Sequence, residues 1–562
     1  MEFLRRYPRL TTLAAFLVLA VLLSSPRLLG ASFYVADDWH DVEIFFWDFW
    51  WLGEALRTGQ DPWFTTAVFY PEGTSLGFHP TGFLYGLISL PFQMLLGVGV
   101  GVVLAYNFIT LASLSLAAWF VYLLARRLGA GELPAFLAGL IYSFSAYHFW
   151  HLGRLHVGGI EFLPLFMLAL LGLVAREVRP WRAGLATGGA GVLLLYSSLT
   201  NFSSAILMTV CLAGVFLVED RRCLLRRRVL GGAAVAAGVI LLAALPFLHA
   251  WLIYPPPVQG ARSVAENTTY SADLLGYVVP GRNSVPYGFL APLLDATHTV
   301  RGEETFTGFL PWLLLPFAFM GGRRPRPWGW LILAAVFGVL SLGPFLKVLG
   351  HETGLLLPYR LLYELVPLLK VNRTPVRYAA PFLLFLAVLA GLGARHLQQR
   401  FPRRWVMPLL LLVGLGEGLF HVPLTPRQEA PAVYALVAES DGVVINVPLY
   451  HARVDRRLMY HQIFHGRPVT TACIPRASDT PHHLIEGTQL RACLLDGAAC
   501  PRADPATVAG EISRLKVSWV LVHTRYMEPA AAAAVDLLLR GAGAQERIDD
   551  PAEIRAYRFQ PW

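Results

Sequence analysis

The residues of this sequence best suited to chemistry are three acids, Asp37, Asp38 and Asp41, which open a polar stretch between two long apolar segments. Asp37 and Asp38 directly follow a segment of membrane-spanning length, so their carboxylates are expected about at the lipid–water boundary. Charged groups at that depth are costly and usually functional. A single acid there would be an ordinary loop residue, but three within five positions predict an active-site loop.

A helix lying in the membrane interface is expected directly after these acids. Apolar side chains recur at helical spacing from Val42 to Leu56. The other face carries polar and Trp side chains, namely Glu43, Trp47, Trp50 and Glu54. Trp at headgroup depth is typical of an interfacial helix. Gly59 and Pro62 are expected to end the helix.

The composition of the whole chain indicates a polytopic membrane protein. Of its 562 residues, 55% are hydrophobic and 15% are charged, and the mean hydropathy is +0.52. The net charge of +9 comes mostly from Arg residues clustered between apolar segments, which is typical of cytoplasmic loops. Basic residues are not interleaved with aromatics on a soluble face, so nucleic acid is not an expected partner. Membrane lipid is.

Eleven apolar segments are candidates to cross the membrane. They lie near 10–30, 103–125, 134–148, 159–175, 183–199, 202–218, 229–250, 306–320, 328–346, 376–394 and 405–420. Small-residue spacings such as Gly184 and Gly188 within them indicate close helix packing. A further apolar run, 82–101, is weakened as a helix by Pro91 and several glycines.

The basic clusters decide how this further run is placed. They are Arg5/Arg6/Arg9, Arg126/Arg127, Arg176/Arg179/Arg182, Arg221/Arg222/Arg226/Arg227/Arg228, Arg323/Arg324/Arg326 and Arg395/Arg400/Arg403/Arg404. All six face the cytoplasm only if 82–101 does not cross, because a crossing there would turn every later cluster outward. The sequence therefore predicts eleven spans, an uncleaved N-terminus inside, an external loop over 31–102, and the C-terminus outside.

After about Thr425 the composition becomes that of a soluble protein. Helices over 431–440, 504–515 and 528–540 are expected to alternate with strands over 442–447, 517–523 and 554–559. The expected fold is an all-α polytopic membrane domain of residues 1–424, with interfacial helices, and a small extracytoplasmic α/β domain of residues 425–562. Cys493 and Cys500 can pair there if the compartment is oxidising, which leaves Cys473 over.

Three further polar groups fall on the same outer face as the acidic loop. Arg373 and Arg377 have i,i+4 spacing just before a span, and they either bind an anion or anchor the helix by snorkelling. A second group consists of His148, His151, Arg154 and His156. Glu303 and Glu304 form a third, as candidates for binding an acceptor or a metal, although solvated loop acids would look the same.

Acids and arginines at an outer membrane face suit a substrate that is itself half in the membrane. A polyprenyl-phosphate-linked sugar has a tail that needs lipid, a phosphate that needs cations, and a sugar that needs a polar cleft. Its transfer needs a base to take the acceptor hydroxyl's proton, whereas the leaving phosphate needs no acid. Arg binds phosphate oxygens bidentately, so Arg373 and Arg377 are the predicted phosphate-binding residues.

Several short motifs also resemble a known family. They are the acid pair with the aromatic helix, GQDPW and FYPEG within 37–73, AYN at 105–107, LARRLG at 124–129, FSAY at 144–147 and RTPVRY at 373–378. This order resembles bacterial multispanning glycosyltransferases of the GT-C superfold, which include relatives of protein mannosyltransferases and lipid A aminoarabinose transferases. The resemblance covers about 31–394, and the tail with HQIFHGRPV at 461–469 is similar to the tails of uncharacterised members.

The resemblance implies an enzyme of the hexosyltransferase type in the bacterial inner membrane, which moves a sugar from a polyprenyl-phosphate donor to a glycan, lipid or protein acceptor. An acid of the first external loop is catalytic in that family, which implies Asp37 or Asp38, with Asp38 preferred because it is nearer the aromatic helix. Asp41, Arg154, His156, Glu303 and Glu304 are candidates for a substrate or metal site. A divalent metal, Mg²⁺ or Mn²⁺, occurs in some members only, so the cofactor stays open.

Two other functions compete with this interpretation. A transporter or flippase of lipid-linked saccharides predicts internal repeats and polar or helix-breaking residues near span midpoints, and the polarity here is one-sided. A non-catalytic envelope assembly protein would have no reason to keep acids at the interface.

Overall fold

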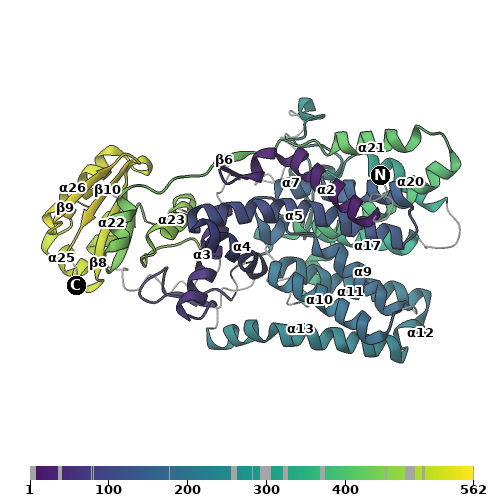
Figure 1. Cartoon of the computed structure of the whole chain (residues 1–562), viewed down its shortest axis with the longest axis horizontal. Coiled ribbons are helices and arrows are strands. Elements are labelled where there is room, and N and C mark those ends of the chain that lie inside the picture. The colour runs from purple at the N-terminus through teal and green to yellow at the C-terminus, as the bar shows by residue number, and fades with distance from the viewer. Residues whose placement is uncertain are drawn as a thin grey trace. The chain divides into compact units, whose positions relative to one another are not determined.

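The computed structural model describes residues 8–35, 41–77, 79, 82–175, 178–254, 263–281, 283–290, 305–320, 327–366, 374–449, 452–474, 488–495, 500 and 502–560. The chain forms two compact units (Figure 1). Unit 1 consists of Met1–Gly30, Asn107–Leu245 and Gly260–Leu424, and unit 2 of Ala31–Tyr106, Pro246–Gln259 and Thr425–Trp562. Contacts therefore group the predicted external loop with the C-terminal part of the chain.

Unit 1 is built from apolar helices. These are α2 (Pro8–Ser24), most of α5 (Val98–Arg127), α6 (Glu132–Ser143), α7 (Ala146–Trp150), α8 (Leu155–Gly158), α9 (Phe162–Val174), α10 (Pro180–Ser197), α11 (Leu199–Glu219), α12 (Arg221–Leu224), most of α13 (Arg227–Ile253), α14 (Val264–Thr269), α16 (Leu310–Leu314), α17 (Pro327–Ser341), α18 (Pro358–Leu365), α20 (Ala379–Arg400) and α21 (Val406–Glu417). Short 3₁₀ turns lie at Pro26–Leu29, Leu275–Tyr277, Gly288–Leu290, Leu315–Phe319 and Pro375–Tyr378, and a hairpin joins β4 (Phe345–Val348) to β5 (His351–Leu356).

Each of the eleven predicted apolar segments contains a helix, but not every helix is long enough to cross a membrane. Among the described residues, five helices have the length and composition of a span: Val98–Arg127, Leu155–Val174, Leu199–Glu219, Arg227–Ile253 and Pro375–Arg400. The segment 306–320 holds only α16 and a 3₁₀ turn, because Pro311 and Pro316 interrupt regular helical hydrogen bonding there. The count of eleven spans is therefore not established by the helices.

The run 82–101 contains two helices rather than one. Helix α4 (Phe83–Leu96) ends at Gly97, whose φ of 75° breaks the helix before α5 begins at Val98. With 14 residues, α4 is only about 21 Å long, short of the roughly 30 Å hydrocarbon core. Helix α4 is therefore not among the helices long enough to span a membrane, and its place relative to the membrane stays a prediction.

Helix packing in unit 1 uses the small residues that the sequence indicates. A Cβ added at Gly184 would lie 2.5 Å from the carbonyl oxygen of Gly232, and one at Gly188 would lie 2.8 Å from Cβ of Val239. Glycines on α10 thus let α13 approach closely, as predicted. Figure 1 shows these two helices near α9 and α11.

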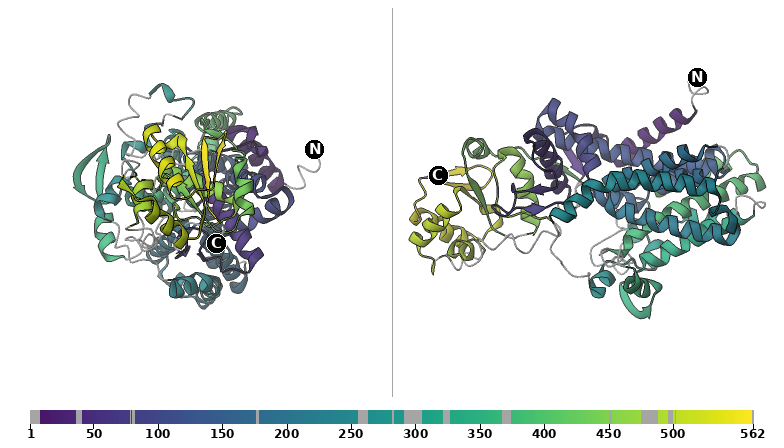
Figure 2. Two further views of the ribbon diagram at one scale, coloured as in Figure 1. Left: turned by 90° about the vertical axis from the view of Figure 1, so that its left-hand side faces the viewer. Right: turned by 90° about the horizontal axis from the view of Figure 1, so that it is seen from below.

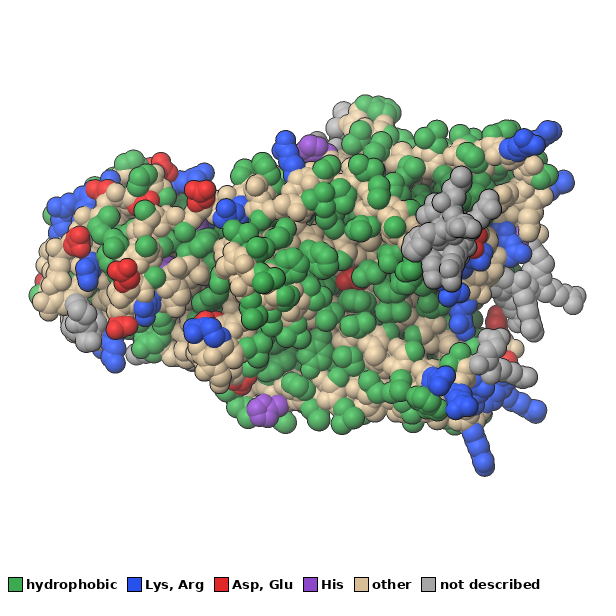
Figure 3. Space-filling view, in the orientation of Figure 1, with side chains coloured by type: hydrophobic (Ala, Val, Ile, Leu, Met, Phe, Trp, Pro, Cys, Tyr) green, Lys and Arg blue, Asp and Glu red, His purple; other side chains and the backbone are tan. Residues whose placement is uncertain are grey.

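Lys and Arg side chains gather at the end of unit 1 where α12 lies, while hydrophobic side chains cover the sides of the helices (Figure 3). Only 17% of the apolar window of α13 is buried, which is expected of a helix facing lipid. The concentration of basic residues at one end agrees with the parity from which the orientation is predicted.

In unit 2, helix α3 (Asp41–Thr58) is surrounded by protein. Every residue from Val42 to Leu52 is buried, including Glu43 and Asp48, so the prediction of an interfacial helix with a polar outer face is wrong. Both α4 and α23 (Ala452–His465) pack against α3 (Figure 1). The helix ends at Thr58, before Gly59 at φ 70°, as the sequence predicts.

The C-terminal part of unit 2 contains a four-stranded sheet in the order β7 (Val443–Val447), β8 (Val517–His523), β10 (Ile554–Arg558), β9 (Glu546–Asp550). The β7–β8 pair is parallel, and the other two pairs are antiparallel. Strands β7 and β8 are wholly buried, as expected for strands covered on both faces. Helices α22 (Val433–Glu439), α24 (Gln489–Leu495), α25 (Pro505–Arg514) and α26 (Pro529–Gly541) accompany the sheet (Figure 2). The short strands β1 (Phe33–Val35) and β6 (Leu424–Pro426) pair, as do β2 (Phe64–Thr65) and β3 (Thr74–Ser75).

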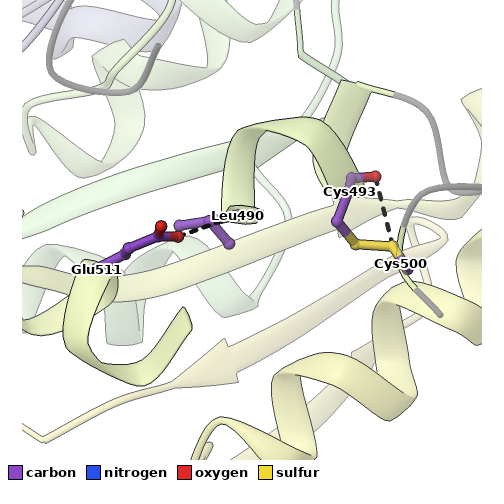
Figure 4. The surroundings of a disulfide bond; sticks show 4 residues. All are labelled: Leu490, Cys493, Cys500 and Glu511. Atoms are coloured by element: carbon purple, nitrogen blue, oxygen red, sulfur yellow. Dashed lines mark hydrogen bonds between the residues drawn. A yellow bond between two sulfur atoms is a disulfide. The ribbon is translucent and has the colours of Figure 1, made fainter. Parts of the chain in front are cut away.

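Cys493 and Cys500 form a disulfide at the end of α24 (Figure 4). Their Cα atoms are 4.4 Å apart. At the other end of α24, the Glu511 carboxylate accepts hydrogen bonds from the amides of Gln489 and Leu490 at 3.0 and 2.9 Å. The sequence correctly allowed this pairing, and Cys473 is a free thiol.

Candidate functional site

Two polar groups that lie far apart in the sequence meet in unit 1. Arg377 Nη1 donates to Thr200 Oγ1 at 3.3 Å, and its Nη2 lies 3.5 Å from His156 Nε2. Arg377 comes from the 3₁₀ turn Pro375–Tyr378, His156 from α8, and Thr200 from the first turn of α11. The structure thus joins the predicted phosphate-binding arginine to the predicted histidine.

Local hydrogen bonds fix this meeting point. Ser198 caps α11 by accepting from the amide of Asn201 at 3.0 Å, and its hydroxyl donates to the carbonyl of His156 at 2.6 Å. Asn201 Nδ2 donates to the carbonyl of Gly159 at 2.7 Å. The start of α11 is therefore bonded to the backbone of α8 and the residue after it, which places Thr200 beside His156.

His151 lies within the electrostatic influence of Arg154 and Arg377. Its Nδ1 bonds the carbonyl of Tyr147 at 2.8 Å, and its ring is buried. Burial, and next the positive charge of Arg154, lower the pKa of His151 to about 3, with a smaller contribution from Arg377. His151 is consequently neutral at pH 7, whereas Arg154 and Arg377 remain cationic.

The cluster sits where long helices begin. Helices α11 and α20 both start beside it, and their N-termini add partial positive charge to that of the arginines. The same two helices end at Glu219 and Arg400, in the region of the basic clusters. The arginine site is therefore at the end of unit 1 opposite those clusters, and its charge and donors suit a phosphate.

Not every predicted residue joins this site. His148 is buried and bonds the carbonyl of Ser143 through Nδ1 at 2.9 Å, so it acts as an ordinary interior histidine. The other predicted residues of the site lie outside the described residues, namely Asp37, Asp38, Arg373, Glu303 and Glu304.

Asp41 belongs to unit 2, where it begins α3. Its Oδ1 lies 2.9 Å from Nε of Arg456 on α23. Two residues on, the buried Glu43 is paired with Arg457 at 3.0 Å. Sequence reasoning missed both arginines, although an acid within an otherwise aromatic helix was a signal that a cation must reach it.

A second buried pair joins the middle of α3 to a residue that follows it in the sequence. Asp48 Oδ1 lies 2.8 Å from His79 Nε2, and both side chains are buried. Burial raises the pKa of Asp48, and His79 opposes that rise. Asp48 also lines a small recess with Trp51, Leu52, Pro62 and Phe83.

Among the described residues, no three His, Cys, Asp or Glu side chains gather in a way that could hold a metal ion. Asp41, the described candidate ligand of the first loop, is engaged by Arg456.

No protein-family model and no curated protein matches the sequence. Solved structures do match the fold, and they are GT-C glycosyltransferases, as the sequence motifs predict. The chain therefore has the GT-C fold of multispanning membrane proteins.

Three of these structures differ in how much of each molecule is shared. The arabinofuranosyltransferase AftD from mycobacteria aligns with a TM-score of 0.61 and 16% identity, over 99% of this chain and 40% of AftD. ArnT from Cupriavidus metallidurans gives 0.51 and 14%, over 98% and 97% of the two chains. The oligosaccharyltransferase AglB from Archaeoglobus fulgidus, in complex with an inhibitory peptide and a dolichol-phosphate, gives 0.50 and 12%, over 100% and 75%. This chain spans only about two fifths of AftD.

Proposed function

We propose that the protein is a membrane glycosyltransferase that moves a sugar, expected to be a hexose, from a polyprenyl-phosphate donor to a glycan, lipid or protein acceptor at the extracytoplasmic face. The observation that carries the proposal is the meeting of Arg377, His156 and Thr200 at the start of two long helices. The GT-C fold supports the reaction class.

The donor's phosphate is assigned to Arg377, together with Arg373 four residues before it. Guanidinium groups bind phosphate oxygens in pairs, and the N-termini of α11 and α20 favour the same negative charge. Because Arg377 starts the candidate span Pro375–Arg400, a phosphate bound there can keep its polyprenyl chain in lipid. His156 and Thr200 orient the guanidinium group.

The acceptor is assigned to the first loop, with Asp38 as general base and Asp37 as its support. The acceptor oxygen bonds to the anomeric carbon, its proton passes to Asp38, and the bond from the anomeric carbon to the phosphate oxygen breaks. Polyprenyl phosphate leaves with that electron pair, and the arginines stabilise its charge. Asp41 is held by an ion pair with Arg456.

Orientation follows from two observations. The basic end of unit 1 is assigned to the cytoplasm, and the opposite end of unit 1, with the arginine site, is assigned to the outer face. The Cys493–Cys500 disulfide supports an oxidising compartment for the C-terminal part. Both are expected of a multi-pass protein of the bacterial inner membrane.

The donor site is tested by binding of undecaprenyl phosphate to the purified protein in lipid nanodiscs. Arg377→Ala should weaken binding roughly 10- to 100-fold, because a hydrogen-bonded charge contributes about 1.5–3 kcal/mol. Arg403→Ala is the matched control, since it removes the same charge from an exposed position near the other end of α20. Equal binding in wild type and Arg377→Ala would reduce Arg377 to a membrane anchor.

Transfer itself is tested by supplying polyprenyl-phosphate-linked sugars with cell-envelope acceptors and measuring the release of free polyprenyl phosphate. Release that depends on the acceptor supports the transferase. Movement of intact donor between leaflets without release would instead indicate a flippase, and binding without either would indicate an assembly protein.

A further inference from the structure

One carboxylate connects the two chain segments that flank the acidic loop. Glu43, which is wholly buried, accepts from Tyr34 Oη at 3.0 Å and from Arg457 Nε and Nη2 at 3.2 and 3.0 Å. Tyr34 precedes the segment 36–40, and Glu43 follows it. The bond between them fixes Tyr34 relative to the first turn of α3.

The two groups that donate to Glu43 keep their protons at neutral pH. Burial, and then the Glu43 carboxylate, raise the pKa of Tyr34, so its hydroxyl stays protonated and donates. Arg457 has only 11% of its side chain exposed and offers two nitrogens to the same carboxylate. Charge-assisted bonds of this kind are directional as well as strong.

Helix α23 holds α3 at further points along its length. Arg456, next to Arg457, binds Asp41 at 2.9 Å in the first turn of α3. Farther along, Trp47 Nε1 donates to Gln462 Oε1 at 2.7 Å. The two helices are thus fixed in both spacing and register.

The same C-terminal segment also forms hydrogen bonds with residues that follow α3. Gln462 Nε2 donates to the carbonyl of Ala67 at 2.6 Å, and the amide of Val469 donates to that carbonyl at 2.9 Å. The amide of Tyr70 donates to the carbonyl of Val469 at 3.1 Å. Residues 456–469 therefore bind the first loop at the start of α3, within α3 and after it.

Stability alone does not require a buried ion pair. An apolar pair of similar volume is often as stable or more stable, because both charges must otherwise be removed from water. What the pair supplies is a unique geometry, since Glu43 bonds Tyr34 and Arg457 together only in one arrangement.

We propose that Arg457, with Glu43 and Tyr34, is a positioning residue for the reaction, through which the C-terminal part of the chain fixes Tyr34 and the first turn of α3, the described residues on either side of the proposed base. This inference rests on the proposed function, because it takes the acid of segment 36–40 as the base. Arg457 is not assigned a contact with substrate, and its effect is expected through Glu43.

The test compares a broken pair with a replaced pair. Arg457→Ala leaves a buried carboxylate uncompensated and is expected to destabilise the protein. The double variant Glu43→Leu with Arg457→Met fills the same space without charge, so it should match wild type in thermal unfolding. Its turnover should nevertheless fall on the order of 100-fold, because a displacement of about 1 Å costs that much.

Further measurements separate positioning from folding. The KM for the lipid donor and the binding of undecaprenyl phosphate should not change in the double variant. Glu43→Gln, which still accepts from Tyr34 and Arg457, should recover most of the turnover. Arg558→Met is the matched control, because it removes an arginine whose pairing with Glu546 at 3.8 Å is about half exposed.

A stable double variant with wild-type turnover would overturn the inference and leave the proposed function intact. Loss of undecaprenyl phosphate binding in the double variant would also overturn it, since the effect would then extend to the donor site. Failure of the proposed function looks different, because wild type itself would then release no polyprenyl phosphate.

Discussion

The two groups of arginines in this chain are held in contrasting ways. Around α3, each arginine meets an acid, as Arg457 meets Glu43 and Arg456 meets Asp41. In unit 1, Arg377 lies 3.3 Å from the hydroxyl of Thr200 and 3.5 Å from the imidazole Nε2 of His156. One arrangement joins opposite charges, and the other joins a guanidinium group to a hydroxyl and an imidazole.

The two arrangements suit different roles. The ion pairs Arg457–Glu43 and Arg456–Asp41 hold α3 and α23 in one geometry. A guanidinium group bonded to a hydroxyl and an imidazole can also donate to phosphate oxygens. We therefore propose Arg377 as the phosphate-binding residue and the first loop as the source of the general base.

The largest expected effect is on the loop. Asp38→Asn keeps size and most hydrogen bonding but removes the base, so transfer should fall by about 10²–10⁴-fold, while binding of undecaprenyl phosphate stays unchanged. Asp37→Asn should cost less. The control is Glu54→Gln on α3, where Glu54 pairs with the exposed Arg57. Full transfer activity in both single variants and in the double variant would remove the loop from the mechanism.

A smaller effect is expected from the disulfide of unit 2. Cys493→Ser with Cys500→Ser opens a loop of seven residues' separation, and loop entropy predicts a loss of about 2 kcal/mol in the free energy of unfolding. Urea unfolding measures that loss, and turnover of the folded enzyme should not change. Cys473→Ser is the control, because that thiol is free. A change in turnover without a change in stability would mean that the disulfide region contributes to the site.

The smallest expected effect is on the pH dependence of the free energy of unfolding, and it comes from buried histidines of unit 2. Burial lowers the pKa of His465 to about 3 and that of His523 to about 4, below the roughly 6.5 of an unfolded chain. The unfolded state therefore binds protons more readily, so their contribution is complete above about pH 6.5 and is lost as pH falls toward 4 and 3.

Each of these histidines should add up to about 1.4 kcal/mol per pH unit to the slope of stability within that window. Thermal unfolding between pH 7 and pH 4 should show it, and His465→Gln should flatten the profile. His351→Gln, at an exposed position of unit 1, should leave the profile as it is. An unchanged slope in His465→Gln would show that other groups control acid stability.

The sequence predicted the apolar helices well because their signal is local. Hydrophobic runs, the glycines of α10 and the Gly59 terminus of α3 are read within a few residues. The strands over 443–447, 517–523 and 554–558 also fall where alternation predicted them. Exact span lengths were not predicted, because Pro311, Pro316 and Gly97 break helices whose composition stays apolar.

The candidate site was predicted only in part for the opposite reason. Arg377 and His156 were each recognised, but nothing local shows that they meet across 221 residues. The environment of α3 was misjudged because the helix that covers it lies 414 residues away, at Arg457. The distribution of apolar and polar side chains around a helix indicates which of its faces can be buried. It does not indicate which distant element covers that face.

The separation between Glu43 and Arg457 also has a consequence for biosynthesis. Glu43 leaves the ribosome 414 residues before Arg457, the residue that pairs with it. Contacts of such long sequence separation form late and slowly. A nascent chain can therefore neutralise the buried acid of α3 with Arg457 only after all the helices between the two residues have been made.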